Sequence, residues 1–372
     1  MTLLDEITRV VDESSHKLLQ RACPPVRYYL LTDVMGRDYD DVLVTRTLEE
    51  CRKYRPRMKL IGTLREDGTW PISKQRRKAE DEGEGPPYGW TYITILRNLY
   101  DLGEYQTTKE EGHVEAALER MLSWQRSDGH IPGPSAKGIP LPHYNGFAFR
   151  NLLKFGLEKD SRVQRLYRWL LSTQRPDGGW VIPYLEDMKY LPEYKPLRQE
   201  RFLEMVKDGK TMKYNPDDYK EIPSCIWTTM MVIRGMAHSY KFASSKEIRL
   251  GADFVLDRFF KPNFHSVFYR SASNWTKMKF PTYFGSGLCA LDILTWLKYG
   301  ADDPRMDRPI RWLLSMRNNE GFWGQSERPH AEKDQWITEI SLSILNRYGE
   351  SLRGEPYGWK AQMAKKGLKV LS

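Results

Sequence analysis

Residues 170–180 read LLSTQRPDGGW, in which the apolar end of a helix is followed by a polar pair, an acidic residue, glycine and tryptophan. We call this segment a clasp. A helix that ends in a left-handed glycine turn leaves glutamine and tryptophan side chains free to join neighbouring helix pairs. The segment recurs three times in the chain, as LIGTLREDGTW at 60–70, MLSWQRSDGHI at 121–131 and LLSMRNNEGFW at 313–323. A fifth, degenerate copy at 254–265 (FVLDRFFKPNFH) lacks the glycine.

Charge-poor, apolar segments alternate with the clasps, and most of them open with proline, which favours the first turn of a helix. These are the expected inner helices, which open near Pro25, Pro87, Pro142, Pro223 and Pro281, with a sixth from Lys333. Amphipathic segments between them are the expected outer helices, at 41–64, 109–124, 161–173, 245–260 and 305–316. Residues 3–22 would supply the sixth outer helix and pack against the last inner helix. The sequence therefore predicts an all-α (α/α)6 toroid of six helix pairs, closed by its N-terminal helix.

The 372 residues contain no Gly/Ser-rich or Pro-rich linker, which favours one domain over residues 1–372. Residues 181–222 form an insertion directly after a clasp, and such a long segment is typical of a lid or a binding element. No segment has the apolar run of a signal peptide or a spanning helix, so we expect a cytoplasmic protein with free cysteines. The basic tail at 355–372 is either a fraying terminal helix or a peripheral membrane contact.

The net charge of +9 would suit an anionic partner. The basic residues are mostly interleaved with acidic ones, however, and the densest basic run, residues 74–78, is followed at once by four acidic residues within 80–84. A solvated loop explains this pattern, so we expect no nucleic-acid partner.

The Q-x-x-D/E-G-x-W form of residues 174–180 resembles the repeat of the terpenoid cyclase and protein prenyltransferase superfamily. Within it the chain looks most like the short bacterial squalene-cyclase-like proteins, which are single toroids of this size. The resemblance covers almost the whole chain as architecture. It implies an isoprenoid or other apolar substrate in a central aromatic cavity, and cyclisation or isomerisation by protonation.

Two motifs of the superfamily are matched only in part. The segment Asp38 to Asp41 (DYDD) has the D-x-D-D form of the protonating motif, but it falls in the turn before an outer helix, where aspartate caps helices. Cys225 has the place of a zinc-binding cysteine, yet Pro223 stands where the family has aspartate, and no histidine opens the next inner helix. We therefore expect a helix cap, a buried small residue, no metal and no cofactor.

Side chains at the starts of the inner helices are expected to face the hollow of the toroid, and an aromatic lining suits an isoprenoid chain or a carbocation. Asp334 is the preferred general acid, and His143 and Glu339 are the further candidates for proton transfer. The expected substrate-binding residues are Tyr88, Trp90, Tyr92, Tyr144, Trp227, Tyr283, Phe284 and Trp336.

The sequence leaves open whether the protein is an enzyme. An aromatic cup also suits a sugar ring, so a glycosidase or lyase on an (α/α)6 toroid is one alternative. A non-catalytic binding module, with aromatic side chains that fill the hollow, is another. Substrate identity and oligomeric state are not determined by the sequence.

Overall fold

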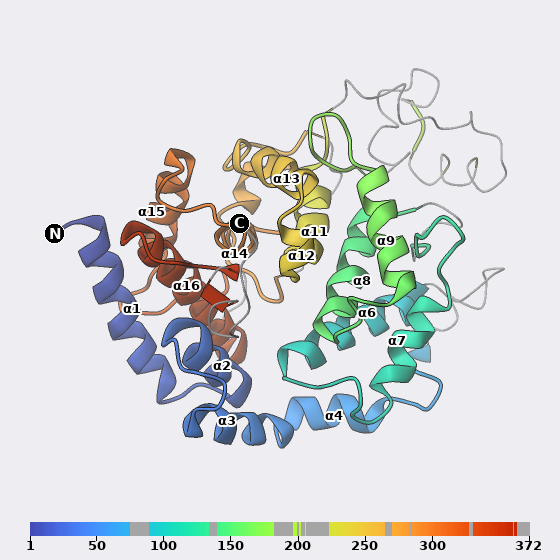
Figure 1. The fold of residues 1–372 in the computed structure, drawn as a ribbon, viewed down its shortest axis with the longest axis horizontal. Coiled ribbons are helices and arrows are strands. Elements are labelled where there is room, and N and C mark those ends of the chain that lie inside the picture. The colour runs from blue at the N-terminus through green and yellow to red at the C-terminus, as the bar shows by residue number, and fades with distance from the viewer. Residues whose placement is uncertain are drawn as a thin grey trace. The chain divides into compact units, whose positions relative to one another are not determined.

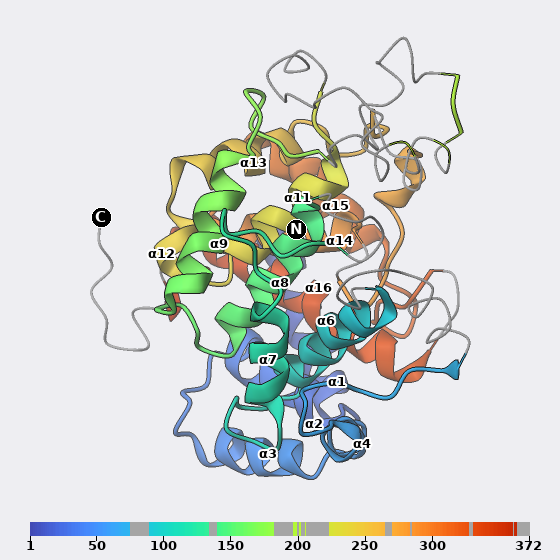
Figure 2. The same cartoon turned by 90° about the vertical axis from the view of Figure 1, so that its right-hand side faces the viewer.

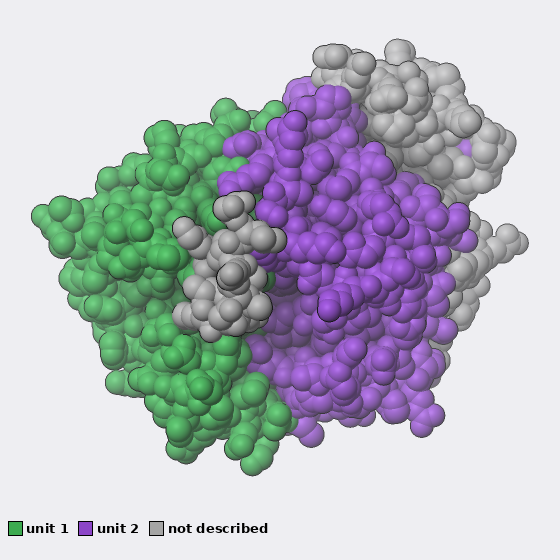
Figure 3. Space-filling view, viewed as in Figure 1, with its two compact units in different colours: residues 1–54, 255–262, 271–372 green, residues 55–254, 263–270 purple. Residues whose placement is uncertain are grey.

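The structure, a computed structural model, describes residues 1–74, 89–133, 140–181, 196–198, 201, 205, 223–264, 270–282, 285–326, 330–359, 361 and 362. Within these ranges the fold is helical, with one isolated bridge between Trp180 and Cys225. The all-α fold class is therefore confirmed. The chain divides into two compact units, residues 1–54, 255–262 and 271–372, and residues 55–254 and 263–270 (Figure 3).

The first unit is organised around its last helix, α16 (Ala331–Leu352), which packs against the N-terminal helix α1 (Leu3–Leu19) (Figure 1). The predicted pairing of the N-terminal helix, as the sixth outer helix, with the last inner helix is thus confirmed. Helix α16 also packs against α14 (Gly287–Trp296) and the π-helix η1 (Leu30–Val34). The remaining elements of this unit are α2 (Pro24–Tyr29), η1 (Leu30–Val34), α3 (Val42–Arg52), η4 (Ala272–Asn274), α14 (Gly287–Trp296), η5 (Pro304–Met306) and α15 (Asp307–Ser315).

The second unit is organised around α8 (Pro142–Lys154), which packs against α6, α9 and α11 (Figure 2). Ten of the thirteen residues of α8 are buried, as expected of an inner helix. The other elements of this unit are α4 (Arg55–Thr63), α6 (Gly89–Glu104), α7 (Val114–Leu122), α9 (Ser161–Ser172), α11 (Ile226–Met236), α12 (Tyr240–Ala243) and nearly all of α13 (Lys246–Leu256).

The glutamines of two clasps join neighbouring outer helices, as predicted. Gln174 Nε2 donates to the carbonyl of Gly178 at 2.8 Å and to that of Glu247, at the start of α13, at 2.7 Å. Gln125 Nε2 makes the equivalent bond to the carbonyl of Arg162, at the start of α9, at 2.8 Å. Each glutamine ties its own turn to the next outer helix.

The tryptophans of the clasps close back on their own helices. Trp180 Nε1 donates to the carbonyl of Leu170 at 2.8 Å, and Trp70 and Trp323 each donate to the carbonyl ten residues earlier. In the degenerate fifth clasp, Trp275 Nε1 donates to the carbonyl of Lys261 at 2.7 Å. A tryptophan distant in sequence thus closes the copy that lacks glycine.

Several predicted helix bounds were wrong. The outer helix expected at 41–64 is two helices, because α3 ends before Lys53, and Pro56 fits only the first turn of a new helix. Helix α14 begins at Gly287, not near Pro281, because Ser286 caps it by accepting from the Cys289 amide. Helix α11 likewise begins after Pro223, at Ile226.

Candidate functional site

The carboxylate of Asp334 accepts backbone hydrogen bonds at the start of α16. Its Oδ1 atom accepts from the Gln325 amide at 2.7 Å, and its Oδ2 atom accepts from the His330 amide at 3.3 Å. The helix itself begins earlier than expected, with His330 as its N-cap. Both oxygens of Asp334 therefore hold the turn that leads into α16.

Trp336, two residues after Asp334 on α16, lies in an aromatic cluster of the first unit. Its ring stacks on Phe280, with centroids 5.0 Å apart, and lies 5.8 Å from the ring of Tyr29. The side chain is fully buried, and its indole N–H has no hydrogen-bond partner among the described residues. A buried donor without a partner is costly, so Trp336 is the one member of this cluster that would gain from an acceptor.

Glu339 is a buried carboxyl group on the next turn of α16, with an exposed fraction of only 4%. Burial raises its pKa well above the usual range, and the negative charges of Asp33 and Asp292 raise it further. Two neighbours oppose this shift: the Ser343 hydroxyl donates to Glu339 Oε1 at 2.8 Å, and Arg347 is positively charged. The surroundings therefore favour the protonated acid and also offer stabilisation to the carboxylate.

Arg347 connects this acid to helix α14. Its Nη2 atom donates to Asp292 Oδ1 at 2.6 Å, and its Nε atom donates to Thr295 Oγ1 at 2.9 Å. The guanidinium group also lies 4.7 Å from the ring centroid of Trp296. These contacts fix a buried cation beside the buried acid, as buried charges require.

Asp33 is a site residue that the sequence analysis missed. It lies in the π-helix η1, where the Thr32 hydroxyl donates to its Oδ1 atom at 2.8 Å, and π-turns are frequent at functional sites. The signal was present, because Asp33 is the only acidic residue in the first inner helix, residues 24–34. A small cavity of about 50 Å³ is lined by Thr32, Asp33, Tyr39, Trp296, Arg347 and Glu350, together with residues near the C-terminus.

A second group of predicted residues lies in the second unit. The ring of Tyr92 lies 6.0 Å from that of Tyr144 and 5.6 Å from that of Trp124, and the His143 ring lies 4.4 Å from that of Tyr144. Burial lowers the pKa of His143 to about 4, so its imidazole is neutral at pH 7. Tyr92 Oη and His143 Nδ1 have no hydrogen-bond partner among the described residues. This cluster thus contains two polar atoms that a bound polar group would satisfy.

The remaining predicted residues divide into two sets. Trp227 is buried on α11, and Trp90 is half-buried on α6. Tyr88, Tyr283 and Phe284 lie outside the described residues, as do most of the 181–222 insertion and most of the basic tail at 355–372. The structure therefore brings together Trp336 with Glu339 in the first unit, and Tyr92 with His143 and Tyr144 in the second.

Two partly matched motifs of the sequence make structural contacts. Asp41 caps α3, because its Oδ1 atom accepts from the Leu43 amide at 2.7 Å, which confirms the capping interpretation of DYDD. Cys225 is buried, and its Sγ atom accepts from Asn263 Nδ2 at 3.2 Å. The described ranges hold no group of three or more metal-ligating side chains. None of the helices described is long and apolar enough to cross a bilayer.

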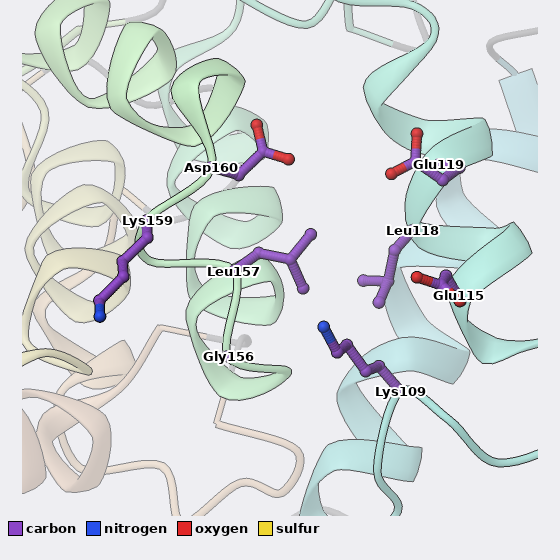
Figure 4. A pocket seen from close by; sticks show the side chains of 8 residues that line it. All are labelled: Lys109, Glu115, Leu118, Glu119, Gly156, Leu157, Lys159 and Asp160. Atoms are coloured by element: carbon purple, nitrogen blue, oxygen red, sulfur yellow. The ribbon is translucent and has the colours of Figure 1, made fainter.

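A pocket of about 220 Å³ lies between the starts of α7 and α9 in the second unit (Figure 4). Lys109 points into it between Leu118 and Leu157, whereas Glu119 and Asp160 lie on opposite sides. Arg162 bonds to both of these carboxylates, at 2.6 Å and 2.7 Å, which lowers the pKa of each. These acids are held as ion pairs and are poor proton donors.

Comparison with known proteins gives no family assignment. No family model matches the chain, and no curated protein sequence matches it. Structures of the type II terpene cyclase MstE from Scytonema are similar to it. A variant in complex with geranylgeranyl dihydroxybenzoate is 12% identical, with a TM-score of 0.44, and the match covers 93% of this chain and 98% of that chain. Another variant, in complex with merosterolic acid A, is 14% identical, with a TM-score of 0.27 over 83% of this chain and 99% of that chain. Such values assign neither a substrate nor a reaction to this chain.

Proposed function

We propose that this protein is a terpenoid cyclase-like enzyme that protonates an isoprenoid or similar apolar substrate, with Glu339 as the general acid. The observation that carries the proposal is the buried, raised-pKa carboxyl of Glu339, one turn from Trp336 on an inner helix. The repeat at residues 174–180 adds its resemblance to proteins that handle isoprenoids.

The chemistry follows from these surroundings. A general acid must retain its proton until the substrate arrives, and burial beside Asp33 disfavours early loss of that proton. Transfer of the proton to a substrate double bond leaves a carboxylate on Glu339 and a carbocation on the substrate. The Ser343 hydroxyl and Arg347 stabilise that carboxylate, while aromatic faces such as that of Trp336 stabilise the cation.

The test compares two acids of the same helix. Wild type, Glu339→Gln and Asp334→Asn are incubated with a panel of prenyl diphosphates and squalene, and products are measured by gas chromatography with mass spectrometry. We expect Glu339→Gln to lose about 10²-fold or more in turnover, the usual contribution of a general acid. Asp334→Asn should retain turnover, with a lower melting temperature. Equal turnover by wild type and Glu339→Gln would exclude this acid.

A non-catalytic binding protein is the second candidate, and the packing of Trp336 favours it. The stacking of Trp336 on Phe280 fills space that a substrate would need. This candidate predicts saturable binding of a panel compound without any product. Product formation that depends on Glu339 would exclude it.

A further inference from the structure

An open groove of about 540 Å³ lies in the first unit, away from α16, and none of the proposed chemistry uses it. Its volume is in the range of small-molecule sites. One wall is the outer helix α15, and the other comes from the degenerate fifth clasp and the segment after η4. The side chains that line it include Phe260, Thr276, Arg308, Arg311, Trp312 and Ser315.

The aromatic part of the groove is packed against neighbouring rings. The rings of Phe260 and Trp312 are nearly perpendicular, with centroids 6.0 Å apart. Phe260 has a φ of 65°, a left-handed conformation that is unfavourable for a residue other than glycine. Its neighbours impose this conformation: Phe259 stacks on Trp275 at 4.4 Å, and Trp275 Nε1 donates to the carbonyl of Lys261.

The indole N–H of Trp312 is an unused donor. It is buried and has no hydrogen-bond partner among the described residues, whereas Trp70, Trp180 and Trp323 all donate to backbone carbonyls. A buried donor that is left without a partner carries an energetic cost. An acceptor on a ligand would remove that cost.

The charge of the groove is positive. Arg308 is exposed, lies 4.8 Å from the ring centroid of Phe260 and makes no ion pair with any described residue. Arg311 is paired with Asp307 at 2.9 Å. Among the described residues that line the groove, none is acidic. The groove thus offers one unpaired guanidinium group directly beside an aromatic ring.

We propose that this groove binds a small aromatic anion, an aryl phosphate or carboxylate free in solution. Its ring would pack against Phe260 and Trp312, and its charged group would pair with Arg308. The Trp312 indole would donate to one of its oxygens. This site is independent of the proposed chemistry at Glu339, and either proposal can fail without the other.

The test uses phenyl phosphate as the probe, with benzyl alcohol as its uncharged counterpart. Binding is followed by the indole N–H signals in two-dimensional NMR spectra of the full chain, with the Trp312 signal identified by its loss in Trp312→Phe. We expect phenyl phosphate to shift that signal downfield with saturation. Arg308→Gln should weaken binding by about tenfold or more, the effect of losing one charge-assisted bond. Arg9→Gln, at an exposed arginine on α1, is the matched control and should bind like wild type.

Three outcomes would overturn the proposal. They are the absence of any shift in the Trp312 signal, equal binding of benzyl alcohol, and an unchanged affinity in Arg308→Gln. Vesicles of phosphatidylglycerol form a further arm, because an anionic membrane offers the same charge. Sedimentation with vesicles that depends on Arg308, without binding of phenyl phosphate, would replace the free molecule with a lipid surface.

Discussion

At the scale of single residues, burial acts in opposite directions on Glu339 and His143. Desolvation disfavours the charged form of each group, so it raises the pKa of the carboxyl and lowers the pKa of the imidazole to about 4. Burial therefore favours the neutral form of both side chains, and their contributions to stability have opposite pH dependence.

Glu339→Gln separates the chemical role of this group from its role in stability. Because the folded pKa of Glu339 lies above the unfolded value of about 4.5, its contribution to stability is complete below that pH and is lost as pH rises toward the folded pKa. Glutamine resembles the protonated acid and can still accept from the Ser343 hydroxyl. We expect equal urea midpoints at pH 4.5 and a higher midpoint for the variant at pH 8. A variant less stable than wild type at pH 8 would show that Glu339 is an ionised carboxylate in the folded protein.

His143→Phe should show the reverse dependence. The folded pKa of about 4 lies below the unfolded value of 6.5, so the stability from neutral His143 is complete above pH 6.5 and is lost as pH falls toward 4. That loss is at most about 3 kcal/mol. Phenylalanine keeps the ring contact with Tyr144 and cannot be protonated, so the variant should unfold at the same temperature at pH 4.5 and pH 7, apart from changes that other groups cause. If the unfolding temperatures of wild type and variant changed with pH in the same way, His143 would be protonated in the folded protein without loss of stability.

At the scale of elements, the clasp glycines can be tested against a glycine in the same backbone conformation. Gly178 has a φ of 86°, and an added Cβ would lie 2.7 Å from the Leu250 carbonyl oxygen of α13. Gly156 has a φ of 78°, and nothing lies within 4 Å of its added Cβ. Gly156→Ala should therefore cost about 1–2 kcal/mol from the conformation alone, and Gly178→Ala roughly 3–4 kcal/mol. Equal losses of unfolding free energy in urea for the two variants would show that α13 moves to make room for the added Cβ.

The elements also show what the sequence could predict. Clasps carry a local signal, because a left-handed turn needs glycine, and that signal correctly indicated the alternation of inner and outer helices, although several helix bounds were wrong. The π-turn of η1 carries no such signal, since Leu30 to Val34 would also fit an α-helix. Asp33 was missed because the sequence analysis considered the starts of the inner helices, whereas Glu339 was named as a further candidate for proton transfer, one turn beyond Asp334. Its pKa depends on burial and on the charges of Asp33, Asp292 and Arg347, which lie far away in the sequence or two helical turns further along α16.

At the scale of the molecule, the first unit depends on its N-terminal helix. Helix α1 buries Ile7, Val10, Val11 and Leu18 as it packs on α16, and an apolar side chain of this size contributes about 1.5–3 kcal/mol when it is buried. Four such side chains approach the net stability of a typical domain, about 5–15 kcal/mol. Deletion of residues 1–22 should therefore abolish cooperative unfolding of the first unit and expose α16 to proteolysis.

A milder change in the same helix serves as the control for this deletion. Thr2→Ala removes one half of the capping box of α1, in which Thr2 Oγ1 accepts from the Asp5 amide and Asp5 Oδ2 accepts from the Thr2 amide. That loss is about 1 kcal/mol, because it weakens one helix end and leaves the packed face intact. The variant should melt a few degrees lower by circular dichroism, with its cooperativity retained. If the truncated chain also melts cooperatively within a few degrees of wild type, α1 only covers a helix that α14 and η1 already hold in place.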